Sequence, residues 1–236
     1  MAEEAIAPWY VHMSSSFDKN ARLAIRRQYE IPREYGIIIP TPDDRPHRPP
    51  VNCVTFFRDQ LIGGLRFPIP PFLIEISRYF DIPLQQFAPN AFRYLCGTYM
   101  LFRLRDIPPT PQNFFMFSYP KLSAPGVFLF QSRTKMVLFG DMPSSLKAWK
   151  SRFFFLKFPG PIPWSHAWKS FLPPLPDVRE FHLLPTFPIY CEKLLGHRLS
   201  IPKWLKVELL YLFGLSPVKP DTHISLGNLL FLSFCL

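Results

Sequence analysis

Residues 126–139 have the sequence GVFLFQSRTKMVLF, and they decide the fold class that we expect. Branched and aromatic residues fill 126–131 and 135–139, and the polar Ser132-Arg133-Thr134 separates these runs. Such residues favour β-strands, and a short polar break between two runs is typical of a hairpin. We therefore predict that 126–131 and 135–139 pair as antiparallel strands.

A third strand is predicted further along the chain at 152–157, where the sequence is RFFFLK. The preceding residues 143–150 have the sequence PSSLKAWK, which indicates a capped helical turn. We expect this turn to bring the third strand back beside the hairpin, so that the strands form one small sheet.

Helices are expected on both sides of these strands, because apolar residues recur three and four positions apart. Pro71 and Pro89 suit first turns of helices, where proline is favoured. The expected helices cover 17–31, 71–80, 90–105 and 202–215, with one more short helical piece at 112–119; residues 54–62 are a short amphipathic segment. Since 29 of the 236 residues are proline, against roughly 5% in an average protein, the elements should be short. The expected class is α+β, with mainly short helices packed on a small antiparallel sheet, proline-rich irregular segments and a C-terminal helix.

Proline-rich stretches divide the chain into four expected parts. Residues 40–50 are a polar, proline-dense loop that we expect to bury no side chains, and prolines recur through 159–188. We expect an N-terminal helix and linker at 1–50 and a core at 51–158. An extended connection at 159–188 and a helical segment with an apolar tail at 189–236 should follow.

The chain is strongly basic, with a net charge of +10 and a pI of about 9.6. Such a charge attracts polyanions, nucleic acid among them, through a field that salt weakens, although solubility alone can also explain it. No apolar run reaches the roughly 18 residues of a membrane helix, and the acidic start at 1–4 differs from a secretory signal. We expect an intracellular protein, nuclear or cytoplasmic, with no membrane partner.

No residue pattern indicates catalysis. The single cysteines Cys53, Cys96, Cys191 and Cys235 are expected to be buried, reduced thiols, and the six histidines form no i, i+4 pair. The carboxylates show no spacing typical of the metal-binding sets that cut DNA. We therefore expect no enzymatic activity, no metal, no cofactor and no small-molecule substrate.

Basic and aromatic residues alternate over 121–157, where Asp141 is the single acid. Cations bind phosphates and rings stack on bases, so this composition suits single-stranded nucleic acid. The alternative is that the rings are core, since Phe153-Phe154-Phe155 cannot all face one side of a strand. We favour the core role for the rings. The candidate nucleic-acid contacts are then the cations Arg133, Lys135, Lys147, Lys150, Arg152 and Lys157.

Arg66 lies between Leu65 and Phe67, so its charge needs a partner. We expect an internal pair with Asp59 or Asp81 rather than contact with another molecule.

Three motifs follow one another in the order of a known plant domain. Gly64-Leu65-Arg66-Phe67-Pro68 precedes Pro89-Asn90-Ala91-Phe92, and 147–155 then carries Trp149-Lys150 and an aromatic run. Upstream, Ile31-Pro32-Arg33-Glu34-Tyr35 is similar to the I-P-x-E-Y opening of that domain. Over about residues 30–170 the chain resembles the plant gypsy-type transposon domain.

This resemblance implies a noncatalytic protein derived from a transposable element, which self-associates in the manner of gag or contacts nucleic acid. The family supplies no catalytic residues to transfer. The alternatives are a degenerate transposase or integrase fragment, or a decayed open reading frame without activity. Because family members continue into long charged coiled coils, the resemblance also implies a truncated chain whose tail at 225–236 is a gene-model artefact.

Overall fold

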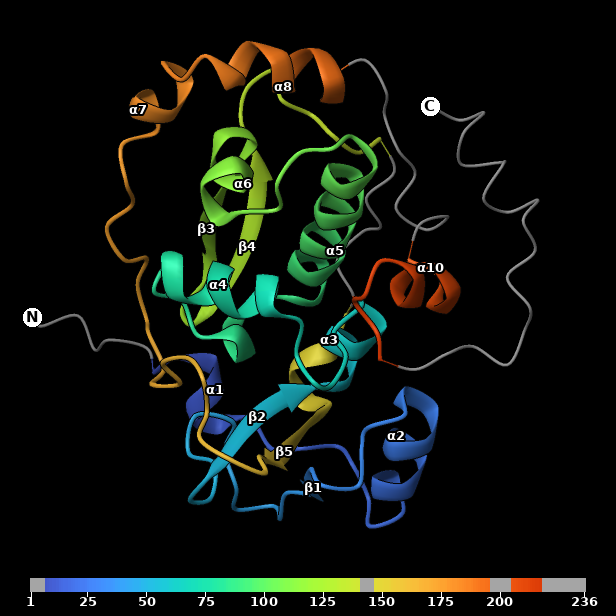
Figure 1. Ribbon diagram of the computed structural model, residues 1–236. Helices are drawn as coiled ribbons and strands as arrows, with labels where there is room; N and C mark the ends of the chain where they lie inside the picture. Colours follow the sequence, from blue (N-terminus) through green and yellow to red (C-terminus); the bar gives the residue numbers. More distant parts are fainter. Residues whose placement is uncertain (1–6, 141–146, 196–204, 218–236) are drawn as a thin grey trace, which may run out of the picture.

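Paired strands and short helices make up the protein in its computed structural model, which describes residues 7–140, 147–195 and 205–217. Figure 1 shows helices gathered around a two-stranded sheet, with a three-stranded sheet below them. This arrangement confirms the expected α+β class.

The helices of the described residues have the bounds α1 (Trp9–His12), α2 (Ala21–Tyr29), α3 (Arg58–Ile62), α4 (Pro71–Tyr79), α5 (Pro89–Leu104), α6 (Pro111–Phe117), α7 (Val178–His182), α8 (Thr186–Leu194) and α10 (Val207–Leu212). The strands are β1 (Gly36–Ile38), β2 (Cys53–Phe57), β3 (Ser118–Ala124), β4 (Val127–Ser132) and β5 (Phe153–Lys157). Short 3-10 helices occur at η1 (Leu84–Gln86) and η2 (Trp149–Ser151).

Proline and side-chain caps set the helix starts. Pro71 and Pro89 are the first residues of α4 and α5, which confirms the helices expected at 71–80 and 90–105. At α6 the hydroxyl of Thr110 accepts a hydrogen bond from the backbone N–H of Asn113 at 3.2 Å. The helix expected at 17–31 begins later, since the Asp18 carboxylate accepts from the N–H groups of residues 20 and 21.

The three-stranded sheet has the order β1-β5-β2, and both of its pairings are antiparallel. Both faces of β5 are covered: Phe154 and Leu156 join the main core, while Phe153 and Phe155 join a second cluster with Trp149. All three phenylalanines are therefore buried, where the sequence required only one to point inward.

The hairpin prediction is wrong about which segment pairs with β4. β4 forms as expected, but it pairs with β3, the segment before it, and not with 135–139. The turn falls at Gly126, whose φ of +72° suits glycine, while the backbone N–H of Arg133 bonds Phe117 O at 2.9 Å. The expected helix at 112–119 accordingly ends at Phe117, because the next residues belong to β3.

β5 is a strand as predicted, but it does not lie in the hairpin's sheet. It pairs with β1 and β2, which come from residues more than ninety positions earlier in the chain. The N-terminal segment therefore contributes an edge strand and buried side chains such as Tyr29 and Tyr35. In the 40–50 loop Pro40 and Pro46 are buried as well, which corrects the expectation that the loop buries nothing.

The C-terminal third is more helical than predicted at one place and less at another. α7 and the start of α8 interrupt the extended connection expected at 159–188, and Figure 1 shows both helices across the top of the two-stranded sheet. The helix expected at 202–215 is confirmed only over α10. Residues 143–146 of the predicted turn, 202–204 of that helix, Cys235 and the tail at 225–236 lie outside the described residues.

Candidate nucleic-acid interface

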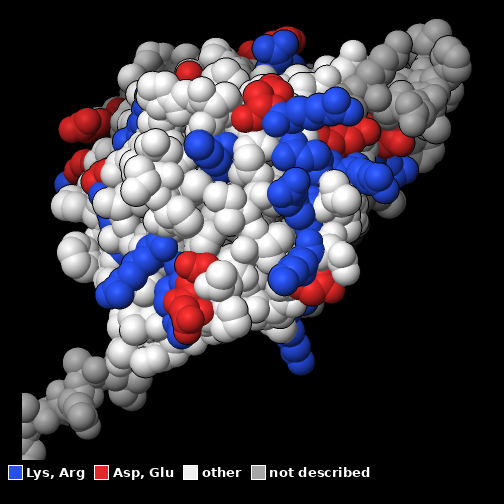
Figure 2. All heavy atoms as spheres, turned by 90° about the horizontal axis from the view of Figure 1, so that it is seen from below, with Lys and Arg blue, Asp and Glu red and all other residues white. Residues whose placement is uncertain are grey.

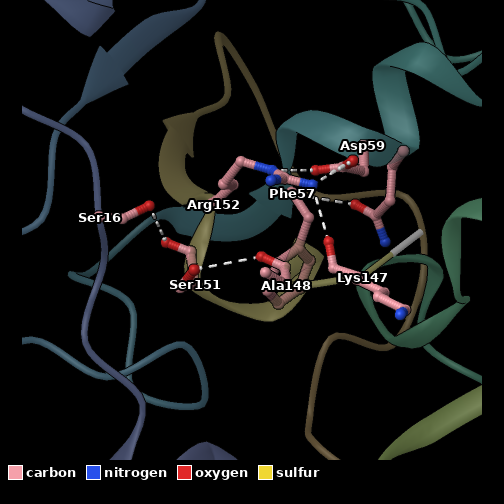
Figure 3. Close-up of polar contacts among 8 residues, drawn as sticks. Ser16, Phe57, Asp59, Lys147, Ala148, Ser151 and Arg152 are labelled. Atoms are coloured by element: carbon pink, nitrogen blue, oxygen red, sulfur yellow. Dashed lines mark hydrogen bonds and ion pairs between the residues drawn. The ribbon is translucent and has the colours of Figure 1, made fainter.

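A buried ion pair fixes the turn that carries most of the predicted cations. Asp59, in the first turn of α3, has a side chain only 1% exposed, whereas that of Arg152 is 30% exposed. The Arg152 guanidinium donates from Nε to Oδ2 at 2.7 Å and from Nη2 to Oδ1 at 2.8 Å (Figure 3). These hydrogen bonds raise the pKa of Arg152, and their paired geometry fixes the direction of the guanidinium.

The same guanidinium closes the turn before β5. Its Nη2 also donates to the carbonyl of Lys147 at 3.2 Å, and the Ser151 hydroxyl donates to the carbonyl of Ala148 at 3.2 Å. From the N-terminal segment, Ser16 donates its backbone N–H and its hydroxyl to Ser151 O at 2.7 and 3.1 Å (Figure 3). The turn at 147–152 is thus held from both sides, with Lys147 exposed and Lys150 half-buried.

Lys150 lies over an aromatic ring rather than beside an acid. Its Nζ is 4.5 Å from the centroid of the Trp9 ring, a cation–π distance, and burial lowers the pKa of its ammonium group. No carboxylate partner of Lys150 occurs in the part of the chain that the structure describes. A cation that is partly desolvated without an acid can still gain energy from an incoming anion.

Aromatic rings continue from Trp9 in both directions. The Trp9 centroid is 6.1 Å from that of Trp149 and 6.1 Å from that of Trp168. Trp168 in turn lies 5.0 Å from Tyr10, and Tyr10 lies 5.1 Å from His47. We call these rings of Trp149, Trp9, Trp168, Tyr10 and His47 the Trp9 strip. Trp9, Trp168 and His47 are half-buried, so parts of their surfaces face solvent.

The other predicted cations lie elsewhere. Arg133 follows β4, and its guanidinium carbon is 4.4 Å from the Phe115 ring centroid, while Nε donates to Phe115 O at 2.9 Å. Lys135 is exposed in a turn with φ of +65°. Lys157 is exposed at the far end of β5, opposite Gly36 and Cys53 in the strand pairing. The structure therefore gathers Lys147, Lys150 and Arg152, and it does not join the remaining three to them.

Arg66 does not form the ion pair that we expected. It donates to the carbonyls of Leu61 at 2.6 Å and Leu65 at 2.8 Å, and its guanidinium lies over the Tyr29 ring at 5.7 Å. Asp59 is occupied by Arg152, and Asp81 pairs with Lys169. Backbone carbonyls and a ring therefore satisfy Arg66 in place of a carboxylate.

Sequence reasoning missed the rings that the fold brings to Lys150. Trp9, Tyr10 and His47 come from the N-terminal segment, and Trp168 comes from the proline-rich connection. A local count of charge and aromaticity over 121–157 cannot find them. The available signal was that Trp9-Tyr10 and Trp168 are large aromatic residues inside segments otherwise expected to be solvent-exposed.

The thiols mostly behave as expected. Cys53 and Cys96 are free and buried, and burial raises the pKa of Cys96 to about 12. Cys191 is free but only half-buried. Among residues 7–140, 147–195 and 205–217, no three His, Cys, Asp or Glu side chains come together as a metal site requires.

Within the same ranges, no helix combines the length and apolar character needed to cross a bilayer. Comparison of the chain with protein-family models, with curated proteins and with solved structures finds no match.

Proposed function

We propose that this chain is a noncatalytic module, derived from a transposable element, that contacts nucleic acid through Lys147, Lys150 and the Trp9 strip. The observation that carries the proposal is the Lys150 ammonium placed 4.5 Å over Trp9, within a row of rings of which Trp9, Trp168 and His47 are half-buried. Cations beside aromatic faces suit single-stranded nucleic acid, because phosphates bind the charge and bases stack on the rings.

The charge balance supports the proposal. The chain carries 27 Lys and Arg against 17 Asp and Glu, and the described residues form three ion pairs. Most cations of the described residues therefore lie outside these ion pairs and contribute to the positive field. Figure 2 shows a band of Lys and Arg side chains, with Asp and Glu side chains beside it, across the face seen from below; this band adds to the overall positive field and is not part of the proposed contact.

The placement of the acids supports a noncatalytic role. Asp59, Asp81 and Asp177 each pair with a cation, and Asp18 and Asp44 accept hydrogen bonds from backbone N–H groups. These carboxylates have structural partners, and none of them lines the cavities beside the loops at 47–53 and 160–168. The free thiols fit an intracellular location, nuclear or cytoplasmic, which is part of the proposal.

The test compares two double variants that remove the same charge. Lys147→Gln/Lys150→Gln removes the proposed contacts, while Arg22→Gln/Arg27→Gln removes two exposed cations of α2. The affinity for a labelled single-stranded oligonucleotide is measured by fluorescence anisotropy over a series of salt concentrations. The first variant should reduce the log–log salt slope by about 1.4, since each lost phosphate contact on a single strand accounts for about 0.7.

The control variant should change the slope far less. An equal effect of both variants would mean that only the overall charge matters. Absence of binding by the unmodified protein at low salt would refute the nucleic-acid function itself.

Self-association is a second candidate function, favoured by a group of exposed apolar side chains at the C-terminal helices. Leu183 is 84% exposed and Leu184 43% exposed in the turn between α7 and α8, and Ile189 of α8 is 51% exposed. Exposed apolar residues that gather on one element indicate a contact surface. Sedimentation should then show a dimer that Leu183→Glu dissociates, whereas Leu23→Glu on α2 should leave it intact. A protein that stays monomeric at high concentration would exclude this role.

A further inference from the structure

Two adjoining cavities of about 440 and 470 Å³ lie between the loop at 47–53 and the loop at 160–168. They share Asn52, His166 and Ala167 in their linings, and we call the two together the groove. Asn52 has φ of +60°, and this tight conformation turns the first loop into β2. The volume matches that of sites for small organic groups, such as a few nucleotides.

The second wall of the groove is fixed by buried glutamines of η1. Gln85 donates to His166 O at 2.7 Å and accepts from the Trp164 indole N–H at 3.2 Å. Gln86 donates to Lys169 O at 2.7 Å and accepts from its backbone N–H at 2.8 Å. Four hydrogen bonds to buried side chains therefore hold a loop that has no regular structure, and the groove is preformed.

The groove lining combines one formal cation, Arg48, with two indole rings. Arg48 and His166 are exposed, His47 is half-buried, and none of the lining residues is acidic. Trp168 and His47 belong both to this lining and to the Trp9 strip, so the groove and the strip meet at these two residues. A nucleic-acid strand bound at Lys150 and Trp9 can therefore continue into the groove, whose lining contains no carboxylate.

We propose that this groove binds a short single-stranded segment of nucleic acid, with Arg48 on a backbone phosphate and unstacked bases against Trp168 and His166. This inference rests on the proposed function and adds the strand type and the route. A duplex keeps its bases stacked inside a wide helix and cannot present them to such a cavity, whereas a single strand can splay them out.

The test uses Arg48→Gln/His166→Ala, because both side chains are exposed and their loss should leave the fold intact. The control is Arg22→Gln, with the same loss of positive charge on α2. Anisotropy is measured with a labelled oligothymidylate and with a labelled duplex of equal length. The groove variant should weaken single-strand binding about tenfold, as expected for one lost stacking contact, and should change duplex binding no more than the control does.

Equal weakening of both probes, or none, would overturn the groove assignment. If the Lys147/Lys150 variant weakens binding and the groove variant does not, the proposed function stands and only this inference fails. If the unmodified protein binds neither probe, both fail. Groove-dependent binding of a polyproline peptide in place of the oligonucleotide would assign the groove to a protein partner and overturn the proposal.

Discussion

Asp59 and Arg152 show how one residue pair organises a surface. The carboxylate is nearly fully buried, and the Arg152 guanidinium that covers it is its ionic partner. Arg152 is also the residue that closes the turn bearing Lys147 and Lys150. The sequence indicated Arg152 as a candidate contact for nucleic acid. In the structure two of its three guanidinium nitrogens donate to Asp59, so Arg152 positions the turn instead.

Replacing Arg152 by Met should destabilise the protein by about 3–5 kcal/mol, because it leaves the Asp59 carboxylate buried without a cation. Urea unfolding followed by circular dichroism measures the change. The double variant Asp59→Leu/Arg152→Met is the control, since replacing a buried pair by apolar groups is often close to neutral. A loss below about 1 kcal/mol in the single variant would contradict this account of the pair.

At the scale of elements, α3 approaches the start of α5 closely at Gly63. A Cβ atom placed on Gly63 would lie 2.5 Å from Pro89 O, which is shorter than real Cβ contacts. Gly63 ends α3 with an ordinary φ of −72°, so space rather than backbone conformation requires glycine here. This packing holds α3, and with it Asp59, against α5.

Gly63→Ala should therefore cost about 1–3 kcal/mol of stability through overpacking. Gly160→Ala is the matched control, since a Cβ there meets nothing within 4 Å, and it should be neutral or stabilising by less than about 1 kcal/mol. Thermal unfolding of the two variants gives the comparison. Equal melting temperatures would show that α5 can move away from α3 without cost.

Elements with local signals were predictable, and those that depend on distant partners were not. α4 and α5 carry their own start signals, Pro71 and Pro89, followed by periodic apolar residues. The hairpin failed because 118–124 and 135–139 are both possible partners of β4, and the choice depends on the turn at Gly126.

For the site, Lys147, Lys150 and Arg152 were found from composition, but Trp9 and Trp168 reach them only through the fold.

On the scale of the whole molecule, segments far apart in sequence build the same layers. β1 and β2 flank β5, and the rings of Trp9 and Trp168 cover the second cluster on its outer face. Residues 1–50 were expected to be an N-terminal helix and a proline-rich linker, and 159–188 a proline-rich connection. Both segments contribute side chains to both cores. The division into four parts remains a prediction, and these contacts make it testable.

A fragment of residues 51–158 should not fold cooperatively, because it lacks β1 and the buried rings of Tyr29, Tyr35 and Trp164. Heating with circular dichroism detection would show a broad transition for the fragment and a sharp one for the full chain. A fragment with a sharp transition of its own would establish 51–158 as an independent domain.

Three indole rings packed at oblique angles should give the protein a characteristic ultraviolet dichroism signal. Trp149 and Trp168 each lie 6.1 Å from Trp9, at interplanar angles of 64° and 63°. Transition dipoles this close and this oblique couple, so the chain should display an exciton couplet in its ultraviolet dichroism spectrum. A ligand that settles on Trp9 disturbs that coupling, which provides a label-free spectroscopic signal at the surface where contact is proposed.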